Sequence, residues 1–309
     1  MTTALINHED ALRHITPDGH PERVARMQNL LPALDGKDLL RIEAPFATDD
    51  DILACHPQDY IDKIRNGIPS EGFNQLDGDT FLSPGSFDAA LRAVGGALKG
   101  VDMVMAGEAQ NAFVAMRPPG HHAETSTPMG FCLFGNVALA AKHALERHGL
   151  SRVAVVDFDV HHGNGTQDLL WSETRSLFIS SHQMPLWPGS GAPSERGAAN
   201  NVMNVPLDPA TSGVVFRQKY EAQVFPALET FKPQLIIVSA GFDAHAADPL
   251  ANINLLEDDF AWVTERTCDV ADKHAEGRVV SCLEGGYDLA ALAASTAAHV
   301  DVLIARGSG

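Results

Sequence analysis

The chain has 309 residues, 45% of them hydrophobic, and a formal net charge of -18, from 22 Lys and Arg against 40 Asp and Glu. This acidic balance argues against nucleic-acid binding, which needs a basic face, and suits a cationic substrate or partner. No apolar run is long enough to cross a membrane, no signal sequence is visible, and the 4 cysteines include no C-x-x-C. We therefore expect a reduced, cytoplasmic protein without membrane contact.

Apolar runs rich in β-branched residues alternate with longer helical patterns along the chain. The runs predict strands over residues 3–7, 111–116, 152–158, 176–181, 234–241 and 278–286. Helices are predicted from an N-cap at Thr48 and over residues 83–107, 136–149, 213–231, 257–275 and 288–305. Strands that are apolar throughout are typical of a parallel sheet. Because no linker or repeat divides the chain, we predict one α/β domain over residues 1–309, with a mainly parallel central sheet and helices on both faces.

Polar residues gather where four of the predicted strands end. The segments are "RPPGHHAE" (117–124), "DVHHGNG" (159–165), "FDAHAADPL" (242–250) and "GGYD" (285–288). Ligands of open α/β sheets bind outside the carboxyl ends of the strands, so we expect these segments to form one site.

Carboxylates and imidazoles in these segments suit a divalent metal ion. Asp157, Asp159 and His161 alternate along the chain, so an extended backbone would turn all three to one side. Aspartate oxygen and histidine nitrogen are ligands for zinc or iron, and either Asp243 or Asp248 could add a third ligand. Two carboxylates and one imidazole leave a coordination position open, as in a catalytic site. The alternative is a salt-bridged strand end with Asp243 in a turn.

Three further side chains suit acid-base and oxyanion chemistry. His121 and His122 follow two prolines, and a rigid histidine pair beside a metal is typical of general acid-base catalysis. Tyr287 follows two glycines at a strand end, where its phenol could hydrogen-bond an oxyanion. Each residue taken alone is more often structural.

Six motifs together resemble the histone deacetylase family, which has the arginase/deacetylase fold, and lie nearest its class II and bacterial members. They are "HPERVARM" (20–27), "RPPGHHAE" (117–124), "GFCLFGNVALAA" (130–141), "DFDVHHGNGTQ" (157–167), "GFDAHAADPL" (241–250) and "EGGYDL" (284–289). Their order and spacing span nearly the whole chain, so the resemblance is specific.

The resemblance implies two cation sites. Asp159, His161 and Asp248 match the zinc ligands of the family, which favours Asp248 over Asp243. Iron(II) would suit the same ligands. Asp157 matches an acid of the catalytic machinery that contacts His121 and a structural potassium ion, and Ser180 matches a further residue of that potassium site.

The resemblance also implies catalytic roles. His122 matches the general base that later acts as the acid, and His121 matches its electrostatic partner. Tyr287 matches the tyrosine that polarises the substrate carbonyl. Asn164 stands where class I members have aspartate, and its neutral amide would stabilise a protonated His122 less than a carboxylate would.

Further positions are implied to contact the substrate. They are Gly130, Phe131, Trp187, Leu255 and Gly286. Phe131 and Trp187 match the aromatic walls of the acyl-lysine tunnel, although the family more often has phenylalanine at the second position. Leu255 stands where polyamine-selective relatives have a glutamate gate, which argues against a strong polyamine preference. Arg23, in "HPER", matches a basic residue that lines the acetate pocket of relatives, and a surface salt bridge in the first helix is the alternative.

The sequence thus predicts a zinc-dependent amidohydrolase that removes acyl groups from lysine side chains of proteins or peptides. A deacetylase of acetylpolyamines or other small amides is the alternative. An arginase-like ureohydrolase and an acyl-lysine-binding module without turnover are less consistent with the complete motif set. A homo-oligomer is compatible with the sequence.

Overall fold

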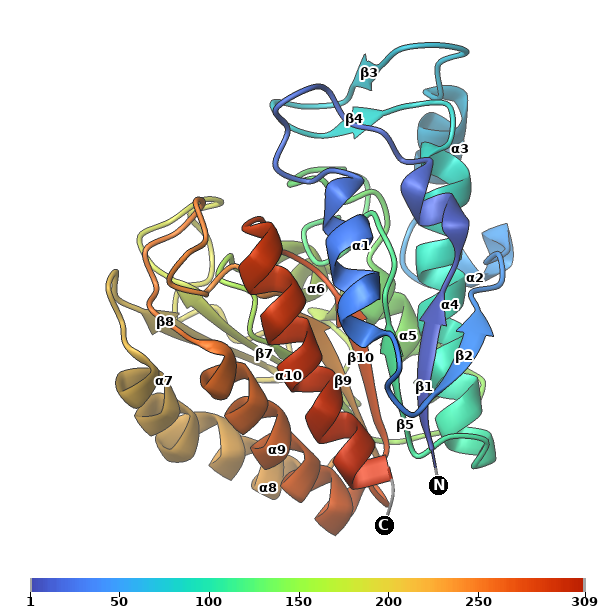
Figure 1. The fold of residues 1–309 in the computed structure, drawn as a ribbon. Helices are drawn as coiled ribbons and strands as arrows, with labels where there is room; N and C mark the ends of the chain where they lie inside the picture. Colours follow the sequence, from blue (N-terminus) through green and yellow to red (C-terminus); the bar gives the residue numbers. More distant parts are fainter. Residues whose placement is uncertain (1, 308–309) are drawn as a thin grey trace.

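The computed structural model describes residues 2–307, so the first and the last two residues of the predicted 1–309 domain lie outside the described part. The described chain contains an eight-stranded sheet in the order β2-β1-β5-β10-β9-β6-β7-β8, and every neighbouring pair is parallel (Figure 1). The strands are β1 (Thr3–Asn7), β2 (Leu39–Glu43), β5 (Asn111–Val114), β6 (Val153–Asp157), β7 (Ser176–Gln183), β8 (Val202–Leu207), β9 (Leu235–Ala240) and β10 (Val279–Leu283). The predicted parallel sheet is confirmed.

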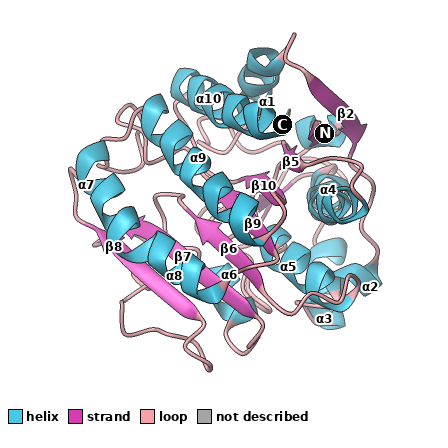
Figure 2. Cartoon of the chain, turned by 90° about the horizontal axis from the view of Figure 1, so that it is seen from below, coloured by secondary structure: helices cyan, strands magenta, loops and turns pink. Residues whose placement is uncertain are grey.

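Helices cover both faces of this sheet (Figure 2). One face carries α1 (Ala25–Leu30), α7 (Gly213–Lys219), α8 (Phe225–Phe231), α9 (Glu257–His274) and α10 (Leu289–Gly307). The other face carries α2 (Asp49–Ile52), α3 (Gln58–Asn66), α4 (Ser86–Ala106), α5 (Asn136–Glu146) and α6 (Asn164–Leu170). A small hairpin of β3 (Asn74–Gln75) and β4 (Phe81–Leu82) stands beyond the sheet, at the top of Figure 1.

The sequence prediction missed the two strands at the sheet edges. An edge strand has one free side and is partly exposed, so it lacks the continuous apolar run by which the inner strands are recognised. In β2 the residues Leu40, Arg41 and Glu43 are exposed. In β8 the strand includes Pro206, which cannot donate a ladder hydrogen bond and is therefore tolerated at an edge.

The predicted helices are present, with one local difference. Thr48 caps α2 as expected, because its hydroxyl accepts the backbone N–H of Asp51 and the Asp51 carboxylate accepts the backbone N–H of Thr48. The predicted helix over 213–231 is α7 and α8 joined by a π-helical turn at Tyr220–Val224. The short helices α1, α3 and α6 were not predicted, since each is too brief to show a helical period.

The last helix, α10, is by length and composition alone able to cross a membrane, and it is the one such helix among residues 2–307. Core helices of soluble domains pass the same test. The helix packs against α9 and α1, and Leu292, Val300 and Leu303 on it are completely buried.

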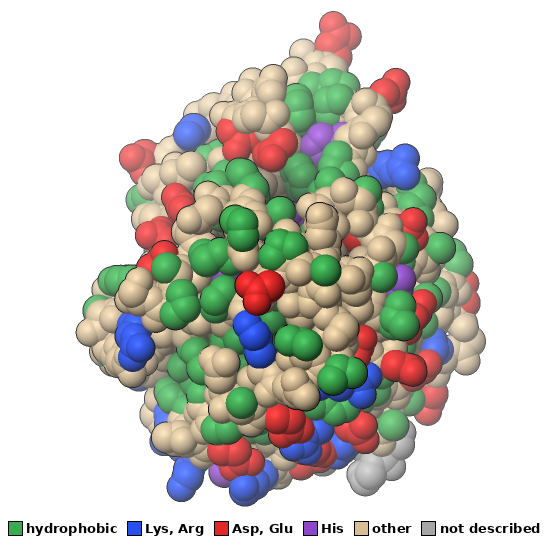
Figure 3. All heavy atoms as spheres, turned by 90° about the vertical axis from the view of Figure 1, so that its left-hand side faces the viewer, with side chains coloured by type: hydrophobic (Ala, Val, Ile, Leu, Met, Phe, Trp, Pro, Cys, Tyr) green, Lys and Arg blue, Asp and Glu red, His purple; other side chains and the backbone are tan. Residues whose placement is uncertain are grey.

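Acidic and basic side chains are mixed on the surface. On the face seen in Figure 3, acidic groups are spread widely, and several Lys or Arg side chains stand beside them. Many of these charges form exposed ion pairs, such as Lys273 with Glu229 and Arg266 with Glu221.

A buried ion network joins the amino-terminal "HPER" segment to two loops at the carboxyl edge of the sheet. Glu22 accepts two hydrogen bonds from Arg117, one of them from Nη2 at 2.7 Å, and Nη1 of Arg26 lies 3.2 Å from the same carboxylate. All three side chains are completely buried. Arg26 also donates to the carbonyls of Gly286 and Glu284. The network therefore positions the loops that follow β5 and β10.

We expect Glu22→Gln to lower the free energy of unfolding by about 3–5 kcal/mol, because it leaves two buried guanidinium groups without their counter-charge. Chemical denaturation followed by circular dichroism measures this loss. Glu108→Gln is the control, since the ion pair of Glu108 with Lys99 is partly exposed and is expected to contribute less than about 1 kcal/mol. Equal losses in the two variants would contradict a structural role for the network.

Candidate active site

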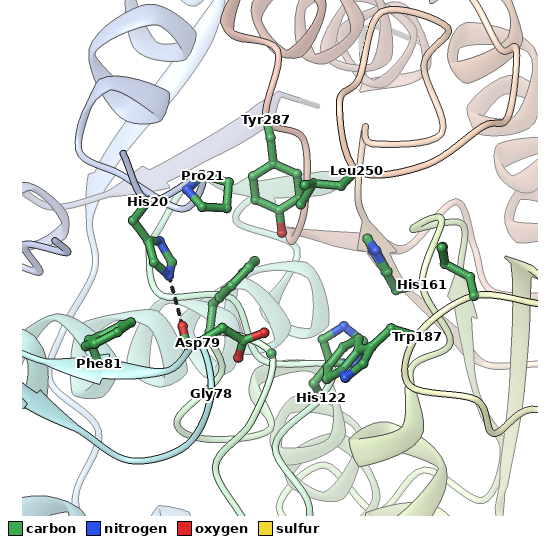
Figure 4. A pocket seen from close by; sticks show the side chains of 13 residues that line it. His20, Pro21, Gly78, Asp79, Phe81, His122, His161, Trp187, Leu250 and Tyr287 are labelled. Carbon is green, nitrogen blue, oxygen red and sulfur yellow. Dashed lines mark hydrogen bonds between the residues drawn. The ribbon is translucent and has the colours of Figure 1, made fainter. Parts of the chain in front are cut away.

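A cavity of about 360 Å³ opens at the carboxyl edge of the sheet. Its lining comes from the loops that follow β1, β5, β6, β7, β9 and β10 and from the hairpin of β3 and β4. The lining residues are His20, Pro21, Gly78, Asp79, Phe81, His122, Gly130, Phe131, His161, Leu186, Trp187, Leu250 and Tyr287. In Figure 4 the Tyr287 hydroxyl points into this cavity, with His20 and Asp79 on one side and His161, His122 and Trp187 on the other.

His122 is held in one tautomer by a chain of hydrogen bonds. The Asn164 amide nitrogen donates to Glu124 Oε1 at 2.8 Å, so its oxygen faces His122 Nδ1, also at 2.8 Å, and accepts the Nδ1 proton. The lone pair of His122 is therefore on Nε2. Burial lowers the pKa of His122 well below its usual value, and the neighbouring His121 and His161 lower it further. His122 is thus a neutral base at neutral pH. Glu124 was not singled out from the sequence, although it lies within a quoted motif.

We expect Asn164→Asp to move the acidic limb of the kcat/KM profile to higher pH by about 1 unit or more, because a carboxylate against Nδ1 raises the pKa of His122. The base is active when neutral, so activity is lost as the pH falls through this pKa, and a raised pKa brings that loss closer to neutrality. A pH–rate profile of wild type and variant measures the shift. An acidic limb that does not move would show that Asn164 does not control this base.

His121 lies between two carboxylates behind His122. Its Nδ1 is 3.0 Å from Asp157 Oδ2 and its Nε2 is 3.7 Å from Asp159 Oδ1. Burial alone would lower the pKa of His121, but Asp159 and Asp157 together raise it well above its usual value. The Glu284 carboxylate accepts the backbone N–H groups of Gly120 and His121, which fixes the loop. His121 is therefore a positively charged neighbour of the His122 ring, whose centroid is 3.9 Å away.

Asp159, His161 and Asp243 form a buried set of ligand atoms within 4.8 Å of one another. His161 Nδ1 is 3.3 Å from Asp159 Oδ1 and 3.0 Å from Asp243 Oδ2. Although burial opposes a charged imidazole, these carboxylates raise the pKa of His161 to about 10. The carboxylates around His161 Nδ1 thus strongly favour a positive charge at that atom.

Asp248 is not part of this close set. Its Oδ2 accepts the backbone N–H of Tyr287 at 2.7 Å and its Oδ1 accepts that of Leu250 at 3.0 Å. Both of these neighbours line the cavity. Asp248 is therefore fixed at the cavity wall, whereas Asp243 is more deeply buried and holds the backbone N–H of Val160 with its second oxygen.

The charge around this set fits a bound cation. Buried carboxylates near the set are Asp157, Asp159, Asp243, Asp248 and Glu284. Among the described residues, none of them forms an ion pair with Lys or Arg, and the ion pairs of this group are all with histidines. Burial raises the pKa of Asp243 and of Glu284 to about 7, as expected for carboxylates without enough positive charge. A metal ion would supply that charge, and oxygen with imidazole nitrogen is a donor set that zinc and iron(II) accept.

Asp157 and Ser180, the two residues of the predicted potassium site, are register partners on the neighbouring strands β6 and β7. Both are completely buried. The Ser180 hydroxyl lies 3.0 Å from His182 Nδ1, and Asp157 Oδ1 accepts the backbone N–H of Asp159.

Tyr287 and its loop are held by Arg26. The guanidinium of Arg26 lies over the Tyr287 ring, 5.1 Å from the centroid, and donates to the carbonyl of Gly286 at 2.7 Å. Gly286 has a φ of 121°, which L side chains rarely adopt. Burial raises the pKa of Tyr287 well above its usual value, so the phenol keeps its proton. The expectation for Arg23 was wrong in position, because Arg23 is exposed and the buried basic residue of this motif is Arg26.

Aromatic rings line two sides of the cavity. The Trp187 ring packs edge-on against His122, with centroids 4.7 Å apart, and the Phe131 ring packs edge-on against Tyr287 at 5.7 Å. Gly130, which precedes Phe131 in the chain, has a backbone φ of 55°. A Cβ there would lie 2.4 Å from the His122 ring and 2.6 Å from Trp187, so only glycine fits.

Leu255 does not line the cavity, contrary to expectation. Its side chain is completely buried in the hydrophobic core, where its segment pairs with the segment of His245. The apolar residue of this region at the cavity is Leu250. His20, Asp79, Phe81 and Leu186 also line the cavity and were not predicted to do so. Asp79 and Phe81 lie far in sequence from the recognised motifs, whereas His20 and Leu186 lie in or beside recognised segments and reach the cavity through the path of their loops.

Comparisons with known proteins agree with this geometry. Residues 20–303 match the family model described as the histone deacetylase domain. The chain is 43% identical over 299 residues to an uncharacterised protein of Synechocystis, covering 94% of this chain and 96% of that protein. It is 37% identical over 298 residues to a probable deacetylase of Archaeoglobus fulgidus, covering 94% of this chain and 82% of the relative.

Two further matches extend the comparison. The chain is 43% identical over 273 residues to a histone deacetylase-like amidohydrolase of Pseudomonas aeruginosa, covering 86% of this chain and 71% of that protein. The crystal structure of the HDA15 HD domain superimposes with a TM-score of 0.93 and 30% identity, over 99% of this chain and 89% of that one. The chain therefore belongs to the histone deacetylase family of hydrolytic deacetylases.

Proposed function

We propose that this protein is a metal-dependent amidohydrolase that removes the acyl group from acyl-lysine side chains of proteins or peptides. The observation that carries the proposal is one cavity that His122, His161 and Tyr287 all line, beside buried carboxylates that form no ion pair with Lys or Arg among the described residues. We propose Asp159, His161 and Asp248 as the metal ligands, with Asp243 as a further carboxylate 3.0 Å from the same His161 nitrogen, Nδ1. Zinc is the expected metal, and iron(II) suits the same donors.

The cavity suits an extended aliphatic chain that ends in an amide. Phe131 and Trp187 offer apolar faces to the methylene groups of a lysine side chain. The acyl group would then reach the inner end, beside His161 and the Tyr287 hydroxyl. The same apolar walls exclude water from around the amide, which strengthens the polar interactions there.

Each polar residue has a part in hydrolysis. A bound divalent metal ion would polarise the acyl carbonyl and lower the pKa of the attacking water. His122 Nε2 takes the proton from that water as its oxygen bonds to the acyl carbon. The Tyr287 hydroxyl donates to the oxyanion that develops. His122 then returns the proton to the amine nitrogen as the C–N bond breaks, which yields a free amine and a carboxylic acid. The acid loses its remaining proton to solvent and becomes a carboxylate.

The proposed potassium site lies next to the catalytic histidine His121. Asp157 and Ser180 would hold the ion between β6 and β7, and Asp157 also holds His121 Nδ1. A cation bound there would offset part of the negative charge of Asp157, the carboxylate that also contacts His121.

A deacetylase of acetylpolyamines is the second candidate. Leu255 is buried away from the cavity, so the sequence-based argument against polyamines no longer applies. The acidic side chain of Asp79 lines the cavity and could attract a cationic amine.

The deciding experiment compares three substrates at equal metal loading: an acetyl-lysine peptide, free acetyl-lysine and an acetylated diamine. We expect the peptide to have the highest kcat/KM, and a chelator to abolish turnover of all three until zinc or iron(II) is restored. Faster turnover of the acetylated diamine would favour the second candidate. Full activity in the chelated protein would refute the metal-dependent mechanism.

A further inference from the structure

A second cluster of metal-type ligands lies away from the cavity, on the packed helices α4 and α5. The Nε2 atoms of His143 and His148 lie 2.7 and 2.8 Å from one oxygen of Asp102. The three ligand atoms all lie within 4.8 Å of one another. We propose that Asp102, His143 and His148 form a second site for a divalent transition-metal ion such as Zn²⁺.

The helices hold the three side chains in place. Asp102 is in the last part of α4, His143 is near the end of α5, and His148 follows that end. The two imidazole rings pack edge-on with centroids 5.4 Å apart. Because α4 and α5 pack along each other, the ligands converge before any ion binds, so little ordering is needed on binding.

The carboxylate of Asp102 has no basic partner that would compete with a metal. Among the described residues, neither Lys nor Arg forms an ion pair with it. The nearby Lys142 pairs with Glu173 at 2.9 Å, and Lys99 pairs with Glu108 at 3.5 Å. Partial burial opposes ionisation of Asp102, but the two imidazoles lower its pKa, so the carboxylate is charged at neutral pH.

Solvent reaches the cluster, which leaves room for water ligands. The side chains of Asp102, His143 and His148 are 45%, 15% and 24% exposed. His143 lines two small cavities of about 50 and 140 Å³, and Asp102 lines the second. The donor atoms are now at hydrogen-bond distance and would move apart by about 0.5 Å to hold a metal at about 2.1 Å. A half-exposed carboxylate can make this movement by a small rotation.

The chemistry of the donors selects the ion. Two imidazole nitrogens and one carboxylate suit Zn²⁺, Ni²⁺ or Cu²⁺ and do not suit Mg²⁺ or Ca²⁺, which prefer oxygen. The cluster lies toward the amino edge of the sheet, since His148 is in the loop that leads into β6, whereas the active-site cavity lies at the carboxyl edge. Occupancy of the two sites can therefore be measured separately.

The test uses the enzyme already loaded with its active-site metal. Equilibrium dialysis against Zn²⁺ is followed by metal analysis, and a thermal melt is recorded with and without Zn²⁺. We expect wild type to bind one more Zn²⁺ per chain than Asp102→Asn or His148→Gln. Zn²⁺ should raise the melting temperature of wild type, and this rise should be lost in both variants. Turnover of an acetyl-lysine peptide should be unchanged.

A matched control separates this site from ordinary surface histidines. His274 contacts Glu229 at 2.7 Å in a histidine–carboxylate pair that lacks a second imidazole. His274→Gln should therefore retain the extra Zn²⁺ and the full thermal shift. The two substituted residues lie in different segments, Asp102 in α4 and His148 after α5. Circular dichroism checks that both variants fold. Equal Zn²⁺ content and equal thermal shifts in wild type and both test variants would overturn the proposal and leave a hydrogen-bonded cluster only.

Discussion

Asp159→Asn is expected to lower kcat/KM for an acetyl-lysine peptide by roughly 1000-fold or more and to reduce the metal content of the purified protein. The Asp159 side chain is within 3.3 Å of His161 Nδ1 and also accepts the backbone N–H of Gly285, so it is central to the proposed metal site. An amide of the same shape keeps the packing but removes the charge that a divalent cation needs, and metal ions contribute several kcal/mol to such reactions. Steady-state kinetics and metal analysis on the same preparation measure both effects.

A buried carboxylate outside the cavity gives the control for this variant. Asp10 is 4% exposed and pairs with Arg92 at 3.1 Å. Asp10→Asn should lower stability and leave the metal content and kcat unchanged. Normal metal content in Asp159→Asn would remove Asp159 from the ligand set.

The same assay identifies the third ligand. If Asp248 coordinates the metal, Asp248→Asn should be as severe as Asp159→Asn. Asp243→Asn should then cost only about 10- to 100-fold in metal affinity, as is usual for a residue that supports a metal site without coordinating the ion. The reverse order of severity would assign coordination to Asp243, which lies closer to His161 Nδ1.

Tyr287→Phe is expected to lower kcat by about 100- to 1000-fold with a much smaller change in substrate affinity. The phenol keeps its proton because burial raises its pKa, and it points into the cavity beside the proposed acyl position. Its hydrogen bond strengthens as charge develops on the acyl oxygen, so its loss affects the transition state more than the bound substrate. Single-turnover kinetics together with inhibitor binding separate the two effects.

Tyr60→Phe serves as the control for a lost buried phenol. The Tyr60 hydroxyl donates to the carbonyl of Leu133 at 2.7 Å and does not line the cavity. The variant should lose about 1 kcal/mol of stability and retain kcat. A Tyr287→Phe enzyme with normal kcat and weak binding would mean that the phenol only holds the substrate.

The sequence by itself determined the class of fold and the chemistry of the site. The inner strands have continuous apolar runs because they are buried on both faces, so a parallel sheet could be predicted without coordinates. Loops after such strands meet at one edge, which is why His121, His122, His161 and Tyr287 could be expected together. These inferences depend on local residue patterns, and local patterns are fully present in the sequence.

Only the tertiary structure decided which particular side chains meet. Asp243 and Asp248 are equivalent by residue type, and their distances from His161 depend on the path of an irregular loop that has no period. Likewise, only the structure shows that Arg26, not Arg23, is the buried basic residue of its motif, and that Leu250, not Leu255, lines the cavity. The hairpin that brings Asp79 to the cavity is packed there by contacts between segments far apart in the chain. Such contacts are set by packing over the whole molecule, which no short stretch of sequence specifies.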